Sequence, residues 1–406
     1  MGPGTTLGPF RFAAFRAIWI ANLFSNVGSM IQSVAAAWLM TELTDSHRLI
    51  ALVQASTTLP ILLFGVVAGA IADNFDRRRV MLTAQIGMLI ASGVLALASY
   101  EGFVTPAILL VLTLAVGIGT ALNSPAWQAS VRAQVGREDL PQAISLNTIA
   151  FNLARSVGPA LGGLLISLWD IGLAFALNAV SYIALIVVLL RWRPQVEPPV
   201  RGPMLATIKA GLHFCMGSPP VRKVLLRGAV IGFGLSAYQA LLPAVVRDQL
   251  GSGEIGFGIL LGAFGISSIL SALFVGSAMR RLGSEAAIGL GTVAFIAAEA
   301  VLALSHGLGL GLVAALLGGV GWVLTLTTLN VAMQVRSPDA ILGRCLAIYQ
   351  AITFGGMAIG AWVWGAVADW HDIQVSLLTA AAWLGISLVL LRLFLPMPAR
   401  GEGVHH

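Results

Sequence analysis

The chain has 406 residues, of which 58% are hydrophobic and only 10% are charged, and its mean hydropathy is +0.91. Soluble proteins carry roughly 25% charged residues, so the composition excludes an ordinary soluble domain. The net charge of +6 does not indicate nucleic-acid binding, because the basic residues stand between hydrophobic stretches and form no single patch. The two cysteines, Cys215 and Cys345, lack the spacing of a disulfide framework or a thiolate metal site.

Hydrophobic stretches follow one another along the chain, and each is long enough to cross a bilayer, which takes about 20 residues. They lie at 14–41, 49–72, 79–99, 105–131, 142–168, 171–192, 224–247, 255–279, 285–304, 308–334, 343–368 and 374–396. No small-residue cleavage site accompanies the first stretch, so we expect it to be retained and not removed as a signal peptide. The sequence therefore predicts an all-α membrane protein with twelve transmembrane helices.

The longest polar interval divides these stretches into two sets of six. It is rich in proline and contains a short amphipathic segment at 205–215. We predict an N-terminal six-helix bundle at 1–192, a cytoplasmic linker with a short amphipathic helix at 193–222, and a C-terminal six-helix bundle at 223–406. Two pseudo-symmetric bundles are typical of secondary transporters, which bind substrate between the bundles near the middle of the membrane.

The basic residues indicate how the helices are oriented. Nearly all of the 23 Lys and Arg residues fall in loops on one side, whereas Arg48 and Arg247 fall on the other. Because positively charged loops stay in the cytoplasm, we expect both termini and the linker to be cytoplasmic. A weak repeat at an offset of 200 residues, which pairs Gly119 with Gly319, supports two related halves.

The loop after the second stretch carries a charged motif, Gly69-Ala-Ile-Ala-Asp73-Asn-Phe-Asp-Arg77-Arg78-Arg. Gly69 lets two helices approach closely. Asp73, at a helix end, can pair with the arginines or cap the N-terminus of a neighbouring helix. From the residues alone, a plain basic loop that only sets the topology remains the alternative.

This loop resembles the signature of the major facilitator superfamily, G-x-L-A-D-R-x-G-R-R/K, with Asn74 and Asp76 in place of Arg and Gly. The Asp-Arg-Arg-Arg form is similar to the branch of enterobactin exporters and macrolide efflux proteins, the transmembrane secretion effectors. The resemblance implies a transporter of two six-helix bundles. It also implies that Asp73 with Arg77 and Arg78 latches and unlatches the cytoplasmic face.

The fifth stretch contains Ala154-Arg-Ser-Val-Gly158-Pro159-Ala-Leu-Gly162-Gly163. Proline removes a helix hydrogen bond and glycines permit close packing, so this helix can bend and seal against a partner from the other half. The segment is similar to G-x-x-x-G-P-x-x-G-G of superfamily antiporters, with Ala154 replacing the first glycine. That resemblance favours export, while ordinary packing of small residues without directionality is the alternative.

The same helix has a polar face that includes Asn147 and Arg155. An arginine at the centre of a membrane helix costs about 2.5 to 3.5 kcal/mol on insertion scales, so we expect Arg155 to face the central cavity and to have a partner. It could bind an anionic or catecholate-like substrate group. Alternatively, it could form a structural pair with a carboxylate or with backbone carbonyls.

Other neutral polar and aromatic residues stand on helices that we expect to border the cavity, and such a lining suits amphiphilic ligands. These residues are Asn22, Asn26, Gln32, Asn123, Trp127, Tyr238, Gln239, Thr325, Asn330, Tyr349 and Gln350. Each is also typical of a hydrogen bond between helices.

Glu299 is the candidate proton site, because it is a carboxyl group inside the ninth stretch. Its alternative is an acid that reaches solvent near a helix end. At the cytoplasmic edge, Asp139, Asp339 and Arg344 are placed to form ion pairs that close the inner face. The sequence Gly365-Ala-Val-Ala-Asp369 repeats the letters of the first signature on the opposite side, without arginines, and we interpret this as coincidence.

No Walker loop, G-x-S-x-G elbow or H-E-x-x-H motif is present. We therefore expect no enzyme activity and no cofactor, with a proton or ion gradient as the energy source. The prediction is a proton-coupled exporter of a small drug-like or siderophore-like amphiphile, working as a monomer in the inner membrane by alternating access. Its partners are the bilayer and the substrate, and no nucleic acid. The alternatives are uptake or lipid transport by the same fold, and a non-transporting receptor or assembly subunit.

Overall fold

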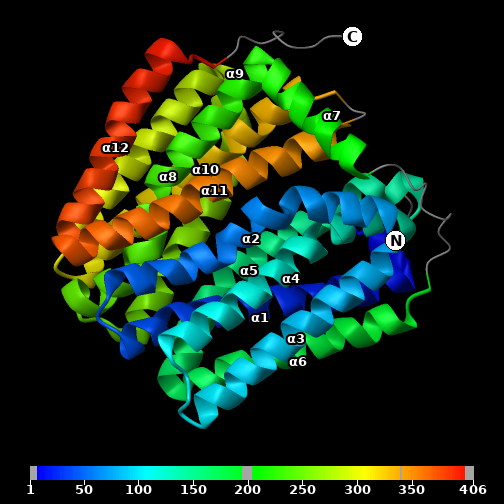
Figure 1. The fold of residues 1–406 in the computed structure, drawn as a ribbon, viewed down its shortest axis with the longest axis horizontal. Coiled ribbons are helices and arrows are strands. Elements are labelled where there is room, and N and C mark those ends of the chain that lie inside the picture. Colours follow the sequence, from blue (N-terminus) through cyan, green and yellow to red (C-terminus); the bar gives the residue numbers. More distant parts are fainter. Residues whose placement is uncertain (1–6, 194–203, 339–340, 398–406) are drawn as a thin grey trace.

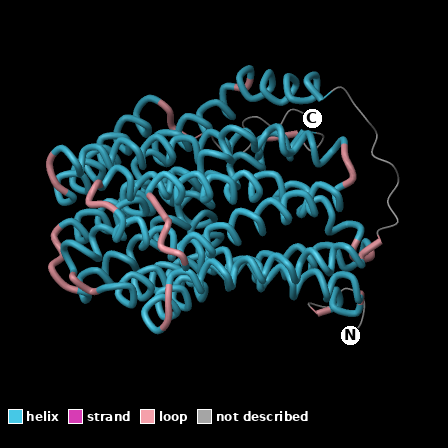
Figure 2. The backbone as a smooth tube through the Cα atoms, turned by 60° about the horizontal axis from the view of Figure 1, so that its bottom comes forward, coloured by secondary structure: helices cyan, strands magenta, loops and turns pink. Residues whose placement is uncertain are grey.

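The computed structural model describes residues 7–193, 204–338 and 341–397, and these residues form helices without any strand (Figures 1 and 2). The first elements are η1 (Gly8–Arg11), α1 (Ala13–Leu43), α2 (His47–Asn74), α3 (Arg77–Tyr100), α4 (Pro106–Ser130), η2 (Val131–Ala133), η3 (Arg137–Asp139), α5 (Leu140–Leu168) and α6 (Ile171–Arg191). They are followed by α7 (Met204–Gly217), α8 (Pro219–Val245), the π-helical turn η4 (Val246–Leu250), α9 (Gly253–Ala303), α10 (Leu308–Arg336), α11 (Leu342–Trp370) and α12 (Ile373–Phe394). The all-α prediction is confirmed for this part of the chain.

Eleven of the described helices are long and apolar enough to cross a membrane, where the sequence predicts twelve stretches. The difference lies in α9, a helix of 51 residues that contains the stretches predicted at 255–279 and 285–304. Gly283 interrupts it with φ of 83° and ψ of 163°, which glycine adopts without a steric penalty because it has no Cβ. We therefore describe α9 as a first rod, 253–282, and a second rod, 284–303.

Figure 1 shows two groups of helices side by side, and we call α1–α6 the N-half and α8–α12 the C-half. In the N-half, α1 packs against α5 and α6, and α3 packs against α4 and α6. In the C-half, α9 packs against α10, and α8 packs against α11 and α12. The halves meet where α2 lies along α11 and where α5 lies along α9. Any movement between the halves must therefore change these two contacts.

The helix α7 lies between the two halves in the sequence, where a short amphipathic helix is predicted. It packs against α2, α8 and α11. The Cys215 thiol of α7 forms a hydrogen bond with the Cys345 thiol of α11, and this bond together with burial raises the pKa of Cys215. A raised pKa keeps the thiol protonated and unreactive. The part of the predicted linker at 194–203 lies outside the described residues.

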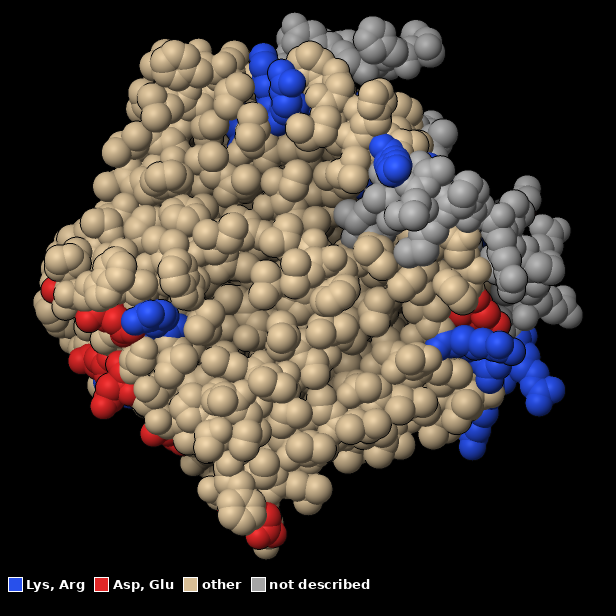
Figure 3. Space-filling model, viewed as in Figure 1, with Lys and Arg blue, Asp and Glu red and all other residues tan. Residues whose placement is uncertain are grey.

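On the face shown in Figure 3, charged side chains gather at the two ends of the helices, and the surface between them carries no Lys, Arg, Asp or Glu, as suits a surface that faces lipid. We call the end with α7 and the start of α1 the basic end, because it holds most of the arginines. The opposite, acidic end carries Glu42, Asp45, Glu101, Asp170, Asp248, Glu254, Asp369 and Asp372, with Arg48 and Arg247 among them. The two ends differ in how they join the halves.

Candidate transport site between the two halves

At the acidic end, side chains of one half form ion pairs with side chains of the other. His47, the first residue of α2, places its ring nitrogens 3.3 Å from Asp248 Oδ2 and 3.4 Å from Asp369 Oδ1. Arg48 Nε lies 3.6 Å from Asp369 Oδ2, and Ser46 Oγ donates a 2.9 Å hydrogen bond to the same oxygen. Asp369 of α11 thus binds three consecutive residues of the N-half. We call Ser46, His47, Arg48, Asp248 and Asp369 the acidic-end latch.

Arg247 of η4 adds a connection in the reverse direction, from the C-half to the end of α1. Its guanidinium donates hydrogen bonds to the backbone carbonyls of Thr41 and Thr44, and lies 3.6 Å from Asp45 Oδ1. The last carbonyls of a helix have no partner within the helix, and the helix dipole favours a cation there. Arg247 therefore stabilises the end of α1 and joins the halves in one arrangement.

Two glycines bring helices of the halves into backbone contact close to the latch. A Cβ atom on Gly163 of α5 would stand 2.7 Å from Gly258 Cα and 2.7 Å from Glu254 O, both in α9. A Cβ atom on Gly365 of α11 would stand 2.8 Å from Arg48 Cα in α2. No side chain larger than a hydrogen fits at either place without moving a helix. Gly365 and Asp369, whose repeat of the signature letters we interpret as coincidence, thus both contact the N-half at the acidic end.

The segment singled out in α5 has two packing partners. Gly158 and Gly162 face α1 of their own half, where Cβ atoms would meet the nearest α1 atoms at 2.5 and 3.2 Å. Gly163 and the Pro159 carbonyl instead face Gly258 of the C-half, whose own Cβ position is 3.2 Å from Pro159 O. The last part of the segment thus lies against the other half, while the first part holds α5 on α1.

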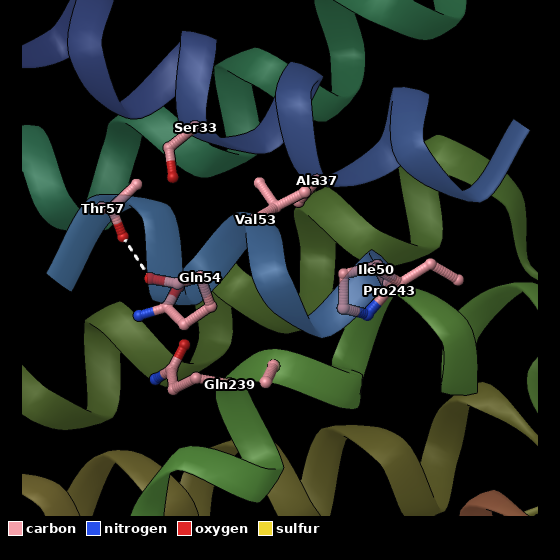
Figure 4. Close-up of a pocket in the computed structure, with 9 residues that line it drawn as sticks. Ser33, Ala37, Ile50, Val53, Gln54, Thr57, Gln239 and Pro243 are labelled. Carbon is pink, nitrogen blue, oxygen red and sulfur yellow. Dashed lines mark hydrogen bonds between the residues drawn. The ribbon is translucent and has the colours of Figure 1, made fainter. Parts of the chain in front are cut away.

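A small cavity lies between the halves on the inner side of the latch (Figure 4). Its polar lining is Ser33 of α1, Gln54 and Thr57 of α2, and Gln239 of α8. Figure 4 shows Gln54 and Gln239 facing one another from opposite halves. The volume of about 20 Å³ is enough for one water molecule. Gln239 is among the predicted cavity residues. Ser33, Gln54 and Thr57 were not predicted, because the sequence distinguishes them only as polar residues within the first two hydrophobic stretches.

Arg155 lies in α5 at the border with the C-half. Its guanidinium carbon stands 5.1 Å from the centroid of the Trp322 ring in α10, which is a cation–π contact across the interface. Among the described residues, no carboxylate or carbonyl accepts a hydrogen bond from this guanidinium. Guanidinium groups present their N–H donors in one plane and bind planar oxyanions in a bidentate manner. Arg155 can therefore hold an oxyanion with its edge while its face rests on Trp322.

Gln32 lies inside the N-half and not at the interface. Its Oε1 atom accepts a 2.7 Å hydrogen bond from Ser92 Oγ and another of 2.7 Å from Asn178 Nδ2. Asn178 also donates to the Tyr182 hydroxyl at 3.0 Å. This network joins α1, α3 and α6, and it uses the polar side chain of Gln32 to hold the half together. A cavity-lining role does not fit this placement.

Three predicted cavity residues are likewise buried inside the C-half, where each contacts residues of that same half. Tyr238 is fully buried and stacks on Phe264 at a centroid distance of 5.7 Å. Thr325 is fully buried, and its hydroxyl faces Gly291 in the second rod of α9. Tyr349 donates a 3.4 Å hydrogen bond to Leu326 O. In a helix that is apolar on every side, a single polar residue does not indicate which side of the helix faces the other half.

The other predicted cavity residues range from buried to exposed. Asn22 is buried, Gln350 is exposed, and Asn26, Asn123, Trp127, Asn147 and Asn330 are partly exposed. Glu299, the candidate proton site, is fully buried in the second rod of α9 and does not reach solvent at the helix end.

At the basic end, the arginines of the signature loop hold the N-half together. Asp76 caps α3 by accepting hydrogen bonds from the backbone N–H groups of Arg78 and Arg79. Arg77 donates a 3.0 Å hydrogen bond to Ala129 O. Arg78 donates to two carbonyls in the last turn of α6, at 2.6 and 2.8 Å. These are interactions within one half, and the Asp73 side chain, the predicted third member of the latch, lies outside the described part.

Of the remaining residues predicted for the basic end, the two that the structure describes, Asp139 and Arg344, contact different parts of the molecule. Asp139 is fully buried and forms a 2.6 Å ion pair with Arg11 of its own half. Arg344 lies against α7, 3.2 Å from the Cβ position of Gly211, while its predicted neighbour Asp339 falls outside the described residues. Gly69 has no described atom within 4 Å of its Cβ position, so the expected close helix approach at Gly69 is wrong.

Comparison with solved structures identifies the fold. The nucleoside transporter NupG, solved as a point mutant, aligns with a TM-score of 0.79 at 15% identity, over 94% of this chain and 100% of that one. A bacterial homologue of the human lysosomal transporter Spinster, inward-facing and unoccupied, aligns with a TM-score of 0.73 at 13% identity, over 95% and 97% of the two chains. The fold is therefore that of major facilitator superfamily transporters.

Comparison of the sequence with protein families identifies the family within this fold. Residues 4–403 match the transmembrane secretion effector family, and the chain belongs to this family. Enterobactin exporters EntS of Shigella boydii and Escherichia coli are 28% identical over 365 residues, covering 87% of this chain and 85% of each relative. The chain is therefore a multi-pass membrane transporter and not an enzyme.

Proposed function

We propose that this chain exports a small amphiphilic molecule by alternating access, driven by a proton or ion gradient. Arg155 carries the proposal, because its guanidinium contacts the Trp322 ring of the other half and donates to no hydrogen-bond acceptor among the described residues. A substrate oxyanion bound there would contact both halves and would sense their relative position. Export as the direction is supported by the similarity to proteins named enterobactin exporters and by the α5 segment that ends at Gly163.

The substrate class we propose is an amphiphile that carries an anionic or catecholate-like group, such as a siderophore. Arg155 supplies the cation for paired oxygens, and Trp322 supplies an aromatic face. Nearer the acidic end, Gln54 and Gln239 offer neutral donors and acceptors from both halves. A largely apolar path with a few such polar groups suits a molecule that is part aromatic and part polar.

We further propose that the described arrangement opens toward the cytoplasm at the basic end. The acidic-end latch and the Gly163 contact hold the opposite end closed, and loops rich in arginine stay in the cytoplasm. In this proposal the chain crosses the membrane twelve times, counting the two rods of α9 separately, with both termini cytoplasmic. Residues 1–192 and 223–406 move as two bundles within a monomer, joined by the linker 193–222.

The opposite, outward-open state needs a closure at the basic end. We propose that Asp73 with Arg77 and Arg78, and Asp339 with Arg344, supply it when the halves rock. Asp73→Asn is then expected to reduce export at normal expression. Full export by this variant would remove Asp73 from the mechanism.

The experiment is accumulation of a catecholate siderophore and of a lipophilic cationic dye in cells expressing the protein, with and without an uncoupler. Wild type should lower accumulation of the substrate only while the gradient is present. Arg155→Ala should lose this effect, Arg155→Lys should keep a part of it, and Arg132→Ala, which removes an exposed arginine, should behave as wild type. Unchanged export by Arg155→Ala would contradict the proposed substrate site.

A further inference from the structure

Glu299 is a buried acid for which no described side chain serves as a partner, and the backbone of Tyr238 is its polar neighbour. It is 0% exposed, and neither carboxyl oxygen has a hydrogen-bond partner of good geometry among the described residues. It lies against Tyr238 of α8, whose hydroxyl is also buried and has no hydrogen-bond partner in the part of the chain that the structure describes. Burying an unpaired charge is far more costly than burying a neutral acid. An ionisable residue in such a place within a membrane helix is by default a functional one.

The charges around Glu299 stand at the ends of the helices. On α8, α10 and α12, which pack against α9, the charged residues are Arg222, Lys223, Arg227, Arg336 and Arg392, all toward the basic end. Toward the acidic end, η4 and the first turn of α9 carry Arg247, Asp248 and Glu254, and His306 stands in the loop after α9. Tyr238 is the titratable side chain that faces Glu299 from a packed element. No charged described side chain therefore compensates the carboxylate form.

A row of aromatic rings leads from this acid to Arg155. Phe295, one turn from Glu299 on the same face of α9, has its ring centroid 5.6 Å from that of Tyr238. Tyr238 stacks on Phe264 at 5.7 Å, and Phe264 meets Trp322 at 6.0 Å. Trp322 is the ring on which Arg155 rests at 5.1 Å. Rigid rings in continuous contact transmit a displacement because a packed core does not deform smoothly.

A second route leads from Glu299 to the acidic surface. Gln249 Nε2 donates a 3.3 Å hydrogen bond to Ala303 O, one helical turn beyond Glu299. Gln249 belongs to the π-helical turn η4, and such turns are frequent at functional sites. Its side chain also lines an open groove of about 490 Å³ together with His47, Asp248 and Asp369. One glutamine thus stands between a groove rich in carboxylates and the turn that holds Glu299.

We infer that Glu299 binds and releases the coupling proton, that the proton arrives from the acidic-end groove past Gln249, and that the aromatic row transmits its binding to Arg155. This inference rests on the proposed gradient-driven export. The proton adds to the carboxylate from water in the groove when the acidic end is open, and leaves to water when the basic end is open. Protonation removes the buried charge, so it favours the state in which Glu299 is enclosed.

The first test needs no substrate. Infrared difference spectra of the purified transporter in lipid, recorded between acidic and alkaline pH, should contain the band of a protonated carboxyl group in an apolar place. Glu299→Gln, which keeps the size of the side chain, should remove that band. Glu101→Gln, which changes an exposed acid in the α3–α4 loop, should leave it. Persistence of the band in Glu299→Gln would overturn the assignment.

The second test measures coupling. In proteoliposomes loaded with a catecholate siderophore, Glu299→Gln should transport at the rate that wild type shows without a pH gradient, with substrate affinity retained. Gln249→Leu should slow proton uptake at the groove side. In a double-mutant cycle, Tyr238→Phe, which keeps the ring and removes only the hydroxyl, should leave the link between Glu299 and Arg155 intact, whereas Phe264→Ala should weaken it.

The outcomes separate the two proposals. Gradient-driven export by Glu299→Gln at the wild-type rate would overturn the proton site and leave the exporter standing. Absence of gradient-driven export in wild type, with the infrared band still lost in Glu299→Gln, would overturn the exporter and keep the proton-binding carboxyl.

Discussion

The acidic and basic ends differ in which half their ion pairs serve. At the acidic end, His47 and Arg48 of the N-half bind Asp248 and Asp369 of the C-half. At the basic end, the described ion pairs stay within a half, Arg11 with Asp139 and Arg227 with Glu285. The ion pairs at the acidic end therefore join the two halves, whereas the ion pairs at the basic end stabilise each half by itself.

Burial separates the two kinds of pair in the same way. Each pair within a half has one fully buried member, Asp139 or Arg227, at 0% and 1% exposed, although Arg11 and Glu285 are 36% and 28% exposed. No latch residue is fully buried, because the exposed fractions of Asp369, His47 and Arg48 are 16%, 20% and 43%. An exposed ion pair contributes about 0 to 1 kcal/mol and is easily exchanged for water. Loss of one partner of a buried pair costs about 3 to 5 kcal/mol. Bonds that must break in each transport cycle are thus weak, and bonds that must last are strong.

The largest expected effect is a loss of stability when the ion pair between Arg227 and Glu285 in the C-half is removed. Arg227→Met removes the partner of Glu285, which it binds with two hydrogen bonds of 2.7 and 2.9 Å. Because Glu285 is 28% exposed, we expect a loss at the lower end of the range, about 3 kcal/mol of stability. Thermal unfolding in detergent would measure it. Arg227→Met with Glu285→Gln should recover part of the loss, and equal unfolding of wild type and single variant would contradict the comparison.

The next effect concerns the backbone contact between the halves. Gly163→Val inserts a side chain where a Cβ atom alone would stand 2.7 Å from Gly258 Cα, and overpacking typically costs about 1 to 3 kcal/mol. The acidic end should then stay open, because the cost falls on the closed state. A thiol reagent that does not cross membranes should label Ser33→Cys faster from the outside in this variant. Gly69→Ala, at a site with room for a methyl group, is the matched control and should change nothing.

The smallest effect is on the latch itself. Asp369→Asn weakens the pairs with His47 and Arg48, and at about 1 kcal/mol the closed population should fall roughly fivefold relative to the open one. Asp372→Asn, three residues further along the chain, is the control, because Asp372 caps α12 of its own half at Val375. The readout is again labelling of Ser33→Cys. Identical labelling rates for Asp369→Asn and Asp372→Asn would mean that the latch does not hold the acidic end.

The sequence predicts the helices well because length and apolarity define a membrane helix. It also places Arg155 and Gly163 on the helix that borders the other half. The sequence does not predict the role of a residue when that role depends on which neighbouring helix its side chain faces. Gln32 and Tyr238 lie in helices without a polar stripe, so their facing direction follows from packing and not from periodicity.

The missed residues show the same limit. Asp369 ends a segment with nearly the same residues as the start of the signature loop, but its partners are His47 and Arg48 of α2. These partners lie some 320 positions away in the chain, so no local pattern predicts them. Gln54 and Gln239 become a pair only when α2 and α8 are brought together. Contacts between distant helices, and not local patterns, make these residues a site.

The measurement that tests alternating access most directly is a pair of distances between spin labels, one pair at each end. With Cys215 and Cys345 replaced by serine, labels at the exposed positions Glu101 and His306 report on the acidic end, and labels at Arg132 and Arg281 report on the basic end. On adding a catecholate siderophore, we predict that the acidic-end distance lengthens while the basic-end distance shortens. Export that proceeds while the acidic-end distance stays fixed, or a change of both distances in the same direction, would contradict the account.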